Sequence, residues 1–147
     1  MNTISASRGF TLLEVMIAIL VFSFGLLGLG LLESLSVKTT QSSSFRSQAT
    51  AMANSILDSM RANRTDVLAG NYYTDFSSVT CASTDPTGST TAARDLAVWK
   101  NLIACTLPGG LGQVHFPGGN QVEVDIAWTD SRWTTTPSAT FSFTSTL

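Results

Sequence analysis

The sequence has few of the residues on which charged binding sites depend. Charged residues make up 12% of the chain, with 8 lysines and arginines against 10 aspartates and glutamates, which is roughly half the share in an average globular protein. No basic patch occurs, so we expect no nucleic acid partner. His115 is the only histidine, and its spacing from Cys81 and Cys105 fits no zinc motif. These shortages argue against a metal site.

The usual signatures of an enzyme are also missing. A thiol nucleophile would need one of the two cysteines beside His115. The two cysteines are better explained as partners in a disulfide. The glycine-rich stretch 109–112 lacks the lysine and the following helix of a phosphate-binding loop. Glu123 and Asp125 share one face of a predicted strand, where a solvated surface explains them. The sequence therefore predicts no enzyme, no cofactor and no metal.

One long apolar run dominates what is present. Residues 15–32 carry no charge, and only Ser23 and three glycines interrupt the bulky side chains. As a helix, residues 10–32 would span roughly 34 Å, enough to cross a bilayer. Glu14 lies at the start of this run, although a carboxylate at the bilayer centre costs roughly 2.5–3.5 kcal/mol. Glu14 therefore needs an explanation.

The residues that flank the apolar run predict its orientation in the membrane and also offer an alternative cleavage site. Arg8 precedes the apolar helix, so the N-terminus is expected to stay in the cytoplasm and the remainder to be exported. Ser34-Leu35-Ser36 imitates a signal-peptidase site, and cleavage there would give a mature chain that begins at Val37. The uncharged run is longer than a typical signal core.

The segment Gly9-Phe10-Thr11-Leu12-Leu13-Glu14 resembles, position by position, the N-terminal motif of the type IV pilin family. The resemblance implies that a prepilin peptidase cuts between Gly9 and Phe10 and methylates the new amine of Phe10. It also implies that Glu14 meets the N-terminal amine of a neighbouring subunit, and pairing makes a buried carboxylate tolerable. The alternative is a Glu14 that reaches the lipid headgroups and has no further role.

Three glycines lie close together in the second half of the run, at Gly25, Gly28 and Gly30. Glycine weakens a helix interior by about 1 kcal/mol per position, and small residues also let helices pack closely in membranes. The resemblance to pilins favours both uses, local loosening and close packing, and both remain open.

The helix is expected to continue through residues 34–63 as an amphipathic helix. Its apolar residues recur at helical spacing; they are Phe45, Ala49, Met52, Ala53, Ile56, Leu57 and Met60. Asn63 and Gly70 are stop signals. The sequence predicts a loop region at residues 64–91 and a short helix at residues 92–105.

Three strands are predicted after this, at residues 112–116, 121–128 and 139–144, with a hairpin turn at 117–120 and a longer connection at 129–138. The expected fold is α+β, with the long helix packed against a small antiparallel sheet, as in pilins. We expect a cleaved leader at 1–9, a transmembrane assembly segment at 10–33, the periplasmic helix at 34–63 and a globular domain at 64–147.

Cys81 and Cys105 both fall in the part that would be exported. An even cysteine count in an oxidising compartment favours one disulfide. Closing a loop of about 25 residues would stabilise the domain by roughly 3 kcal/mol. Two buried free thiols are the alternative.

A second resemblance, to the PilV family of minor pilins (type IV pilus modification proteins), covers most of the mature chain. It rests on five segments: Arg46-Ser47-Gln48-Ala49, Met60-Arg61-Ala62-Asn63-Arg64, Trp99-Lys100, Leu107-Pro108-Gly109-Gly110-Leu111-Gly112, and Val124-Asp125-Ile126-Ala127-Trp128-Thr129-Asp130. It implies a structural subunit of the type IV pilus or of its initiating tip complex, which supports assembly, motility and adhesion.

The implied partners are the prepilin peptidase, other minor pilins and the major pilin. The implied location is the bacterial inner membrane, crossed once, and then the pilus at the cell surface. Two other functions stay open: a type II secretion pseudopilin, which shares the N-terminal motif, and a surface-binding adhesin that uses residues 71–91 or the 129–138 connection.

Overall fold

The structure, a computed structural model, describes residues 9–84, 86–130 and 139–146. The expected leader, apart from Gly9, and residues 131–138 of the expected connection lie outside these ranges. The chain divides into two compact units, Met1–Gln41 and Ser42–Leu147. The helix α1, Leu12–Ala62, contributes its first part to one unit and its last part to the other.

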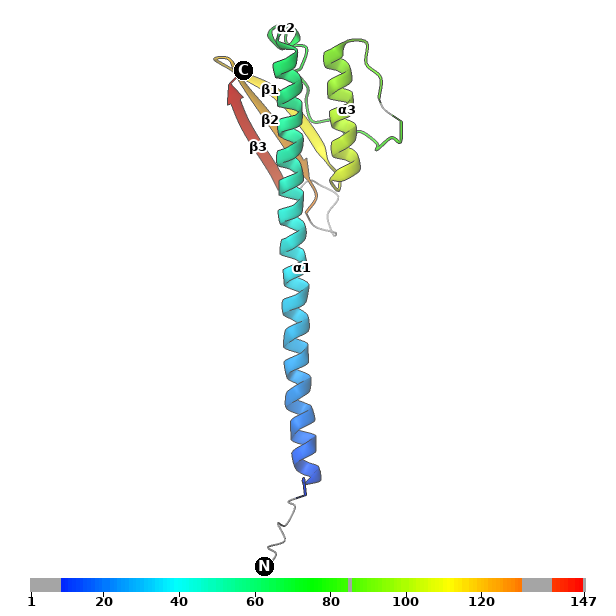
Figure 1. Cartoon of the computed structure of the whole chain (residues 1–147), viewed down its shortest axis with the longest axis vertical. Coiled ribbons are helices and arrows are strands. Elements are labelled where there is room, and N and C mark those ends of the chain that lie inside the picture. The colour runs from blue at the N-terminus through cyan, green and yellow to red at the C-terminus, as the bar shows by residue number, and fades with distance from the viewer. Residues whose placement is uncertain (1–8, 85, 131–138, 147) are drawn as a thin grey trace, which may run out of the picture. The chain divides into compact units, whose positions relative to one another are not determined.

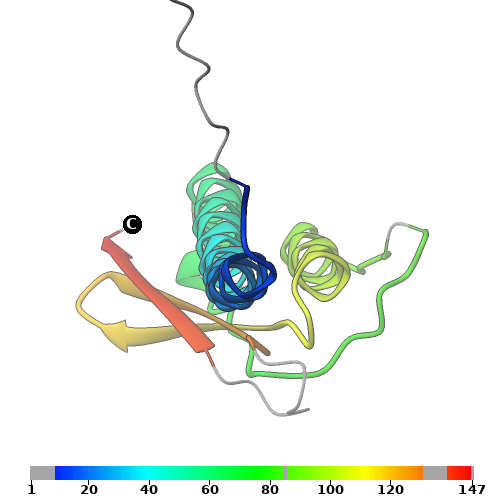
Figure 2. The same ribbon diagram turned by 90° about the horizontal axis from the view of Figure 1, so that it is seen from below.

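The second unit contains the rest of the secondary structure. Its elements are α2 (Arg64–Leu68), α3 (Thr91–Thr106), β1 (Leu111–Gly118), β2 (Gln121–Trp128) and β3 (Ala139–Thr146). The strands form one antiparallel sheet in the order β1-β2-β3. The last part of α1 and the helix α3 lie side by side over one face of this sheet (Figure 1, Figure 2). This arrangement confirms the predicted α+β fold.

The core of the second unit lies between the helices and the sheet. The predicted stripe of α1 is buried from Ala49 to Met60, and Phe45 packs against it, partly buried. The sheet contributes the alternating residues Val122, Val124, Ile126 and Trp128 of β2, together with Val114 of β1. Alternation in the strand and helical spacing in α1 thus bring two apolar faces together.

A tight turn sets the pairing of β1 with β2. Gly118, Gly119 and Asn120 all have positive φ angles, which glycine and asparagine adopt most easily. The turn places His115 opposite Glu123 and Gln113 opposite Asp125. It lies where the sequence predicted it.

The α3 helix is anchored at its start and along its inner side. The hydroxyl of Thr90 caps it by accepting a hydrogen bond from the backbone N–H of Ala93 at 3.2 Å. The indole Nε1–H of Trp99 donates to the backbone oxygen of Met52 in α1 at 2.9 Å. This bond fixes the depth at which α3 packs against α1.

The prediction that residues 64–91 form only a loop was wrong at two places. The chain forms the short helix α2, whose Asp66 lies in the favourable first turn and accepts side-chain hydrogen bonds from Asn63 and Asn71. Thr74 then pairs with Val114 at the edge of the sheet. Local side-chain bonds and the free edge of β1 therefore order this region.

Candidate functional site

The segment that carries the motif lies at the N-terminal end of α1. Gly9, Phe10 and Thr11 precede the helix, and the Phe10 residue is 82% exposed. The backbone N–H of Glu14 donates to the carbonyl oxygen of Thr11 at 3.1 Å and to its hydroxyl at 3.3 Å. A threonine followed three residues later by a glutamate is the spacing of a capping box. The motif thus also begins the helix.

Glu14 lies in an apolar surface although it is ionisable. A shallow hollow at this end of α1 is lined by Phe10, Glu14, Val15, Ala18, Ile19 and Phe22. Among the residues that the structure describes, no cationic group forms an ion pair with Glu14. Within the described residues, this carboxylate therefore has no counter-charge.

The remainder of the first unit is an apolar helix without internal packing. Every residue from 9 to 41 is exposed, and α1 is long and apolar enough to cross a membrane by length and composition. Apart from the helix backbone and the chain neighbours around each glycine, no atom of the described residues lies within 4 Å of the Cβ position that a side chain would add at Gly25, Gly28 or Gly30. Among the described residues nothing fills the space at the three glycines, which leaves it open to another molecule.

The structure joins Cys81 and Cys105 in a disulfide. Cys105 lies in the last turn of α3, so the bond ties the segment before α3 to the end of that helix. The side chain of Asn101 accepts from the backbone N–H of Ala82 at 2.8 Å and donates to its oxygen at 3.2 Å. The disulfide is therefore part of a wider attachment of this segment to α3.

Lys100 makes a neighbouring attachment. Its ammonium group donates to the backbone oxygen of Asp75 at 2.9 Å and to the hydroxyl of Ser77 at 2.7 Å. Burial lowers the pKa of Lys100, and the charge of Asp75 acts in the opposite direction. The two contacts hold residues 75–77 close to α3.

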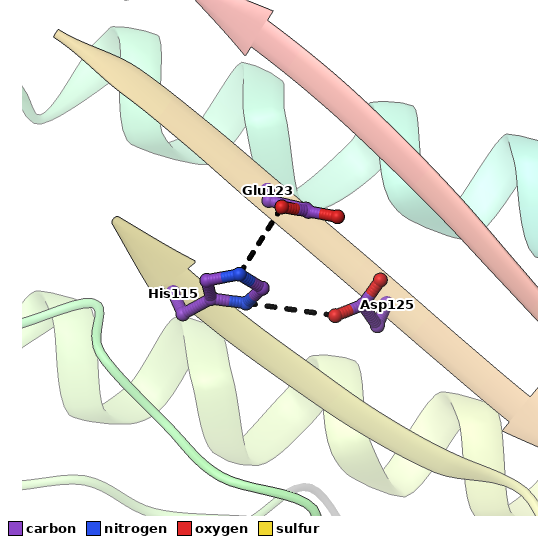
Figure 3. A group of neighbouring side chains, drawn as sticks. All are labelled: His115, Glu123 and Asp125. Atoms are coloured by element: carbon purple, nitrogen blue, oxygen red, sulfur yellow. Dashed lines mark ion pairs between the residues drawn. The ribbon is translucent and has the colours of Figure 1, made fainter. Parts of the chain in front are cut away.

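A cluster on the sheet face away from the helices was not expected. His115 of β1 lies beside Glu123 and Asp125 of β2 (Figure 3). The prediction of a solvated outer face was wrong for Asp125, whose side chain is only 12% exposed, whereas that of Glu123 is 30% exposed. The predicted turn fixes the strand register and could have revealed the pairing of His115 with Glu123.

The comparisons with known proteins agree with the N-terminal geometry. A family model for the prokaryotic N-terminal methylation motif matches residues 4–30. No curated protein and no solved structure matches the chain.

The motif supports a type IV pilin-like or pseudopilin protein and suggests a structural, non-enzymatic role. The motif is the prepilin peptidase cleavage site of pilins, so it points to that enzyme and to pilus proteins as partners. With the apolar helix, it suggests membrane anchoring and pilus association.

Proposed function

We propose that this chain is a minor pilin, most similar to the PilV family, and a structural subunit of the type IV pilus or of its initiating tip complex. The observation that carries the proposal is the methylation motif at the start of a helix that is apolar and fully exposed in its first part, up to residue 41. Such a helix requires lipid or protein around it, and a pilin has lipid before assembly and other pilin helices afterwards.

Each segment has a role in this proposal. Residues 1–9 are the leader that the prepilin peptidase removes, residues 10–33 cross the inner membrane, and residues 34–63 continue as a periplasmic helix that carries the domain at 64–147. Arg8 before the helix keeps the N-terminus cytoplasmic. The disulfide of the domain suits an oxidising periplasm.

Glu14 is the proposed assembly contact. Cleavage before Phe10 creates a cationic amine, which becomes N-methylated and lies four residues before Glu14 of the same chain. A neighbouring subunit displaced along the filament axis brings its own amine to this Glu14. The lack of a described counter-charge, together with the apolar surroundings of Glu14, supports an ion pair that forms between subunits.

The pseudopilin of type II secretion is the second candidate, because it shares the N-terminal motif. The segment Met60-Arg61-Ala62-Asn63 favours the pilus, because it resembles the minor pilins. Recovery of the processed protein in purified pili would support the pilus, whereas recovery only in secretion complexes would support the pseudopilin.

Processing of the N-terminus provides the first experiment. The mature protein should begin at Phe10 and carry one added methyl group, which mass spectrometry of the N-terminal peptide measures. Gly9→Leu should leave the precursor uncut, because a narrow peptidase site accepts glycine and rejects a larger side chain. Gly25→Leu makes the same change far from the cut site and should be processed normally. A mature chain that begins at Val37 would instead indicate ordinary signal cleavage.

A further inference from the structure

The cluster of His115, Glu123 and Asp125 has the composition and the placement of a cation site. His115 and Glu123 lie directly opposite each other on paired strands, and Asp125 lies two residues further along β2 on the same face. Figure 3 shows the imidazole ring between the two carboxylates. One nitrogen or oxygen atom from each side chain lies within 4.8 Å of the others.

The hydrogen bonds of this cluster are incomplete. His115 Nε2 lies 3.1 Å from Glu123 Oε2, and His115 Nδ1 lies 3.5 Å from Asp125 Oδ2. Nδ1 is buried and makes no hydrogen bond. A neutral imidazole carries one N–H and can donate to only one of the carboxylates. Its other nitrogen then turns a lone pair toward a carboxylate oxygen, which is unfavourable.

The two carboxylates also lack a strong counter-charge. Within the described ranges, His115 is the only basic group that pairs with either of them. Asp125 is nearly buried, and burial of an unpaired carboxylate is costly. A cation among the three side chains would remove the repulsion between the carboxylates and use the lone pair of the imidazole.

We propose that these three side chains bind one divalent transition-metal ion of the zinc class. Imidazole nitrogen favours Zn²⁺ and related ions, whereas Ca²⁺ and Mg²⁺ prefer oxygen ligands alone. Ligand bonds of about 2.0–2.2 Å in tetrahedral geometry place neighbouring donor atoms roughly 3.3–3.5 Å apart. Nε2 and Glu123 Oε2, 3.1 Å apart, already have nearly this spacing. Asp125 Oδ2 lies beside Nδ1, so the Asp125 side chain has to turn toward the ion to become the third ligand. Water takes the fourth position.

The site links β1 to β2 next to their hairpin, so the ion should stabilise the sheet. Because protons compete with the metal for the imidazole and the carboxylates, binding should weaken as the pH falls. A purely structural ion pair would not respond to added metal.

The test uses the full mature chain in detergent micelles, without a polyhistidine tag and stripped of metal by a chelator. Zn²⁺ is titrated in competition with a chromophoric chelator, and thermal unfolding is followed with and without the ion. We expect one Zn²⁺ per chain and a higher melting temperature with Zn²⁺. His115→Gln, Glu123→Gln and Asp125→Asn should each weaken binding by at least about tenfold.

Asp58→Asn is the matched control. It removes one carboxylate charge from an exposed ion pair with Arg61, and it should leave Zn²⁺ affinity unchanged. Circular dichroism checks that each variant is folded, and His115→Gln and Glu123→Gln act at half-exposed positions where folding should survive. The proposal is overturned if the wild-type chain does not hold Zn²⁺ against the chelator, or if any of the three folded variants keeps the wild-type affinity.

Discussion

Replacing Gly112 with alanine should destabilise the domain, because α3 packs directly on this glycine. A Cβ atom at Gly112 would lie 2.6 Å from two atoms of the Trp99 ring and 2.7 Å from Cδ1 of Ile103. The ring cannot move away freely, because its indole N–H is bonded to the oxygen of Met52. Overpacking of this kind costs roughly 1–3 kcal/mol, and we expect Gly112→Ala to lie in the upper half of that range.

A double variant separates this clash from other effects of alanine. The two close ring atoms belong to the outer edge of the Trp99 indole, which phenylalanine lacks. Trp99→Phe alone should be destabilising, because it leaves a cavity and removes a hydrogen bond with a net value of about 0.5–1.5 kcal/mol. In the double variant the new methyl group enters the vacated space. The double variant should lose less free energy of unfolding than the two single variants lose in sum, by about 1 kcal/mol or more.

The assay is unfolding of the full chain in micelles by denaturant, monitored by near-ultraviolet circular dichroism, which reports packing of the buried tryptophans. Gln113→Ala is the control, because it alters the adjacent position on the opposite face of β1; it should have a small effect. Strictly additive losses in the Gly112→Ala and Trp99→Phe cycle, or a Gly112→Ala variant as stable as the wild type, would refute this packing argument.

Two further predictions concern the same domain. Replacing Cys81 and Cys105 with serine should lower the free energy of unfolding by roughly 3 kcal/mol in the chain-entropy model; non-reducing peptide mapping of the wild type should recover the linked pair, and two freely labelled thiols would contradict it. Burial and the hydrogen bond to Asp95 raise the pKa of Tyr72 to about 12, so the stabilisation by its neutral form is complete below about pH 10, the ordinary tyrosine value. This stabilisation should be lost as the pH rises through 12. Between pH 8 and 12 the free energy of unfolding should therefore fall less in Tyr72→Phe than in the wild type. An equal fall in both would contradict this reasoning.

Much of the second unit could be predicted from local patterns. The stripe from Phe45 to Met60 and the alternation in residues 121–128 each have one dominant period, and the glycines of the turn at 117–120 select the hairpin. These features require no knowledge of distant contacts, which explains why helix, strands and turn lie where they were expected.

The burial of Asp125 could not be predicted in this way. Alternation assigns Asp125 to the outer face of β2, and that assignment is correct, but it does not say how much of that face is covered. Asp125 pairs with Gln113 of β1 and Ser142 of β3, and its carboxylate lies 3.5 Å from His115, so its burial involves neighbours on other strands. The helix α2 was missed for a related reason, because Asp66 and its asparagine partners order a segment that has no apolar periodicity.

The most direct test of the central claim compares Glu14→Gln with the wild type in sheared pili and in membranes of the same cells. Insertion and cleavage should be unchanged, because the helix becomes more apolar and Gly9 and Phe10 are intact. The ratio of pilus protein to membrane protein should fall sharply, because loss of a buried charge partner typically costs roughly 3–5 kcal/mol. Glu33→Gln, the same change at an exposed position further along α1, should keep the wild-type ratio. If Glu14→Gln enters pili at the wild-type ratio, Glu14 is not an assembly contact and the carboxylate is merely solvated at the membrane interface.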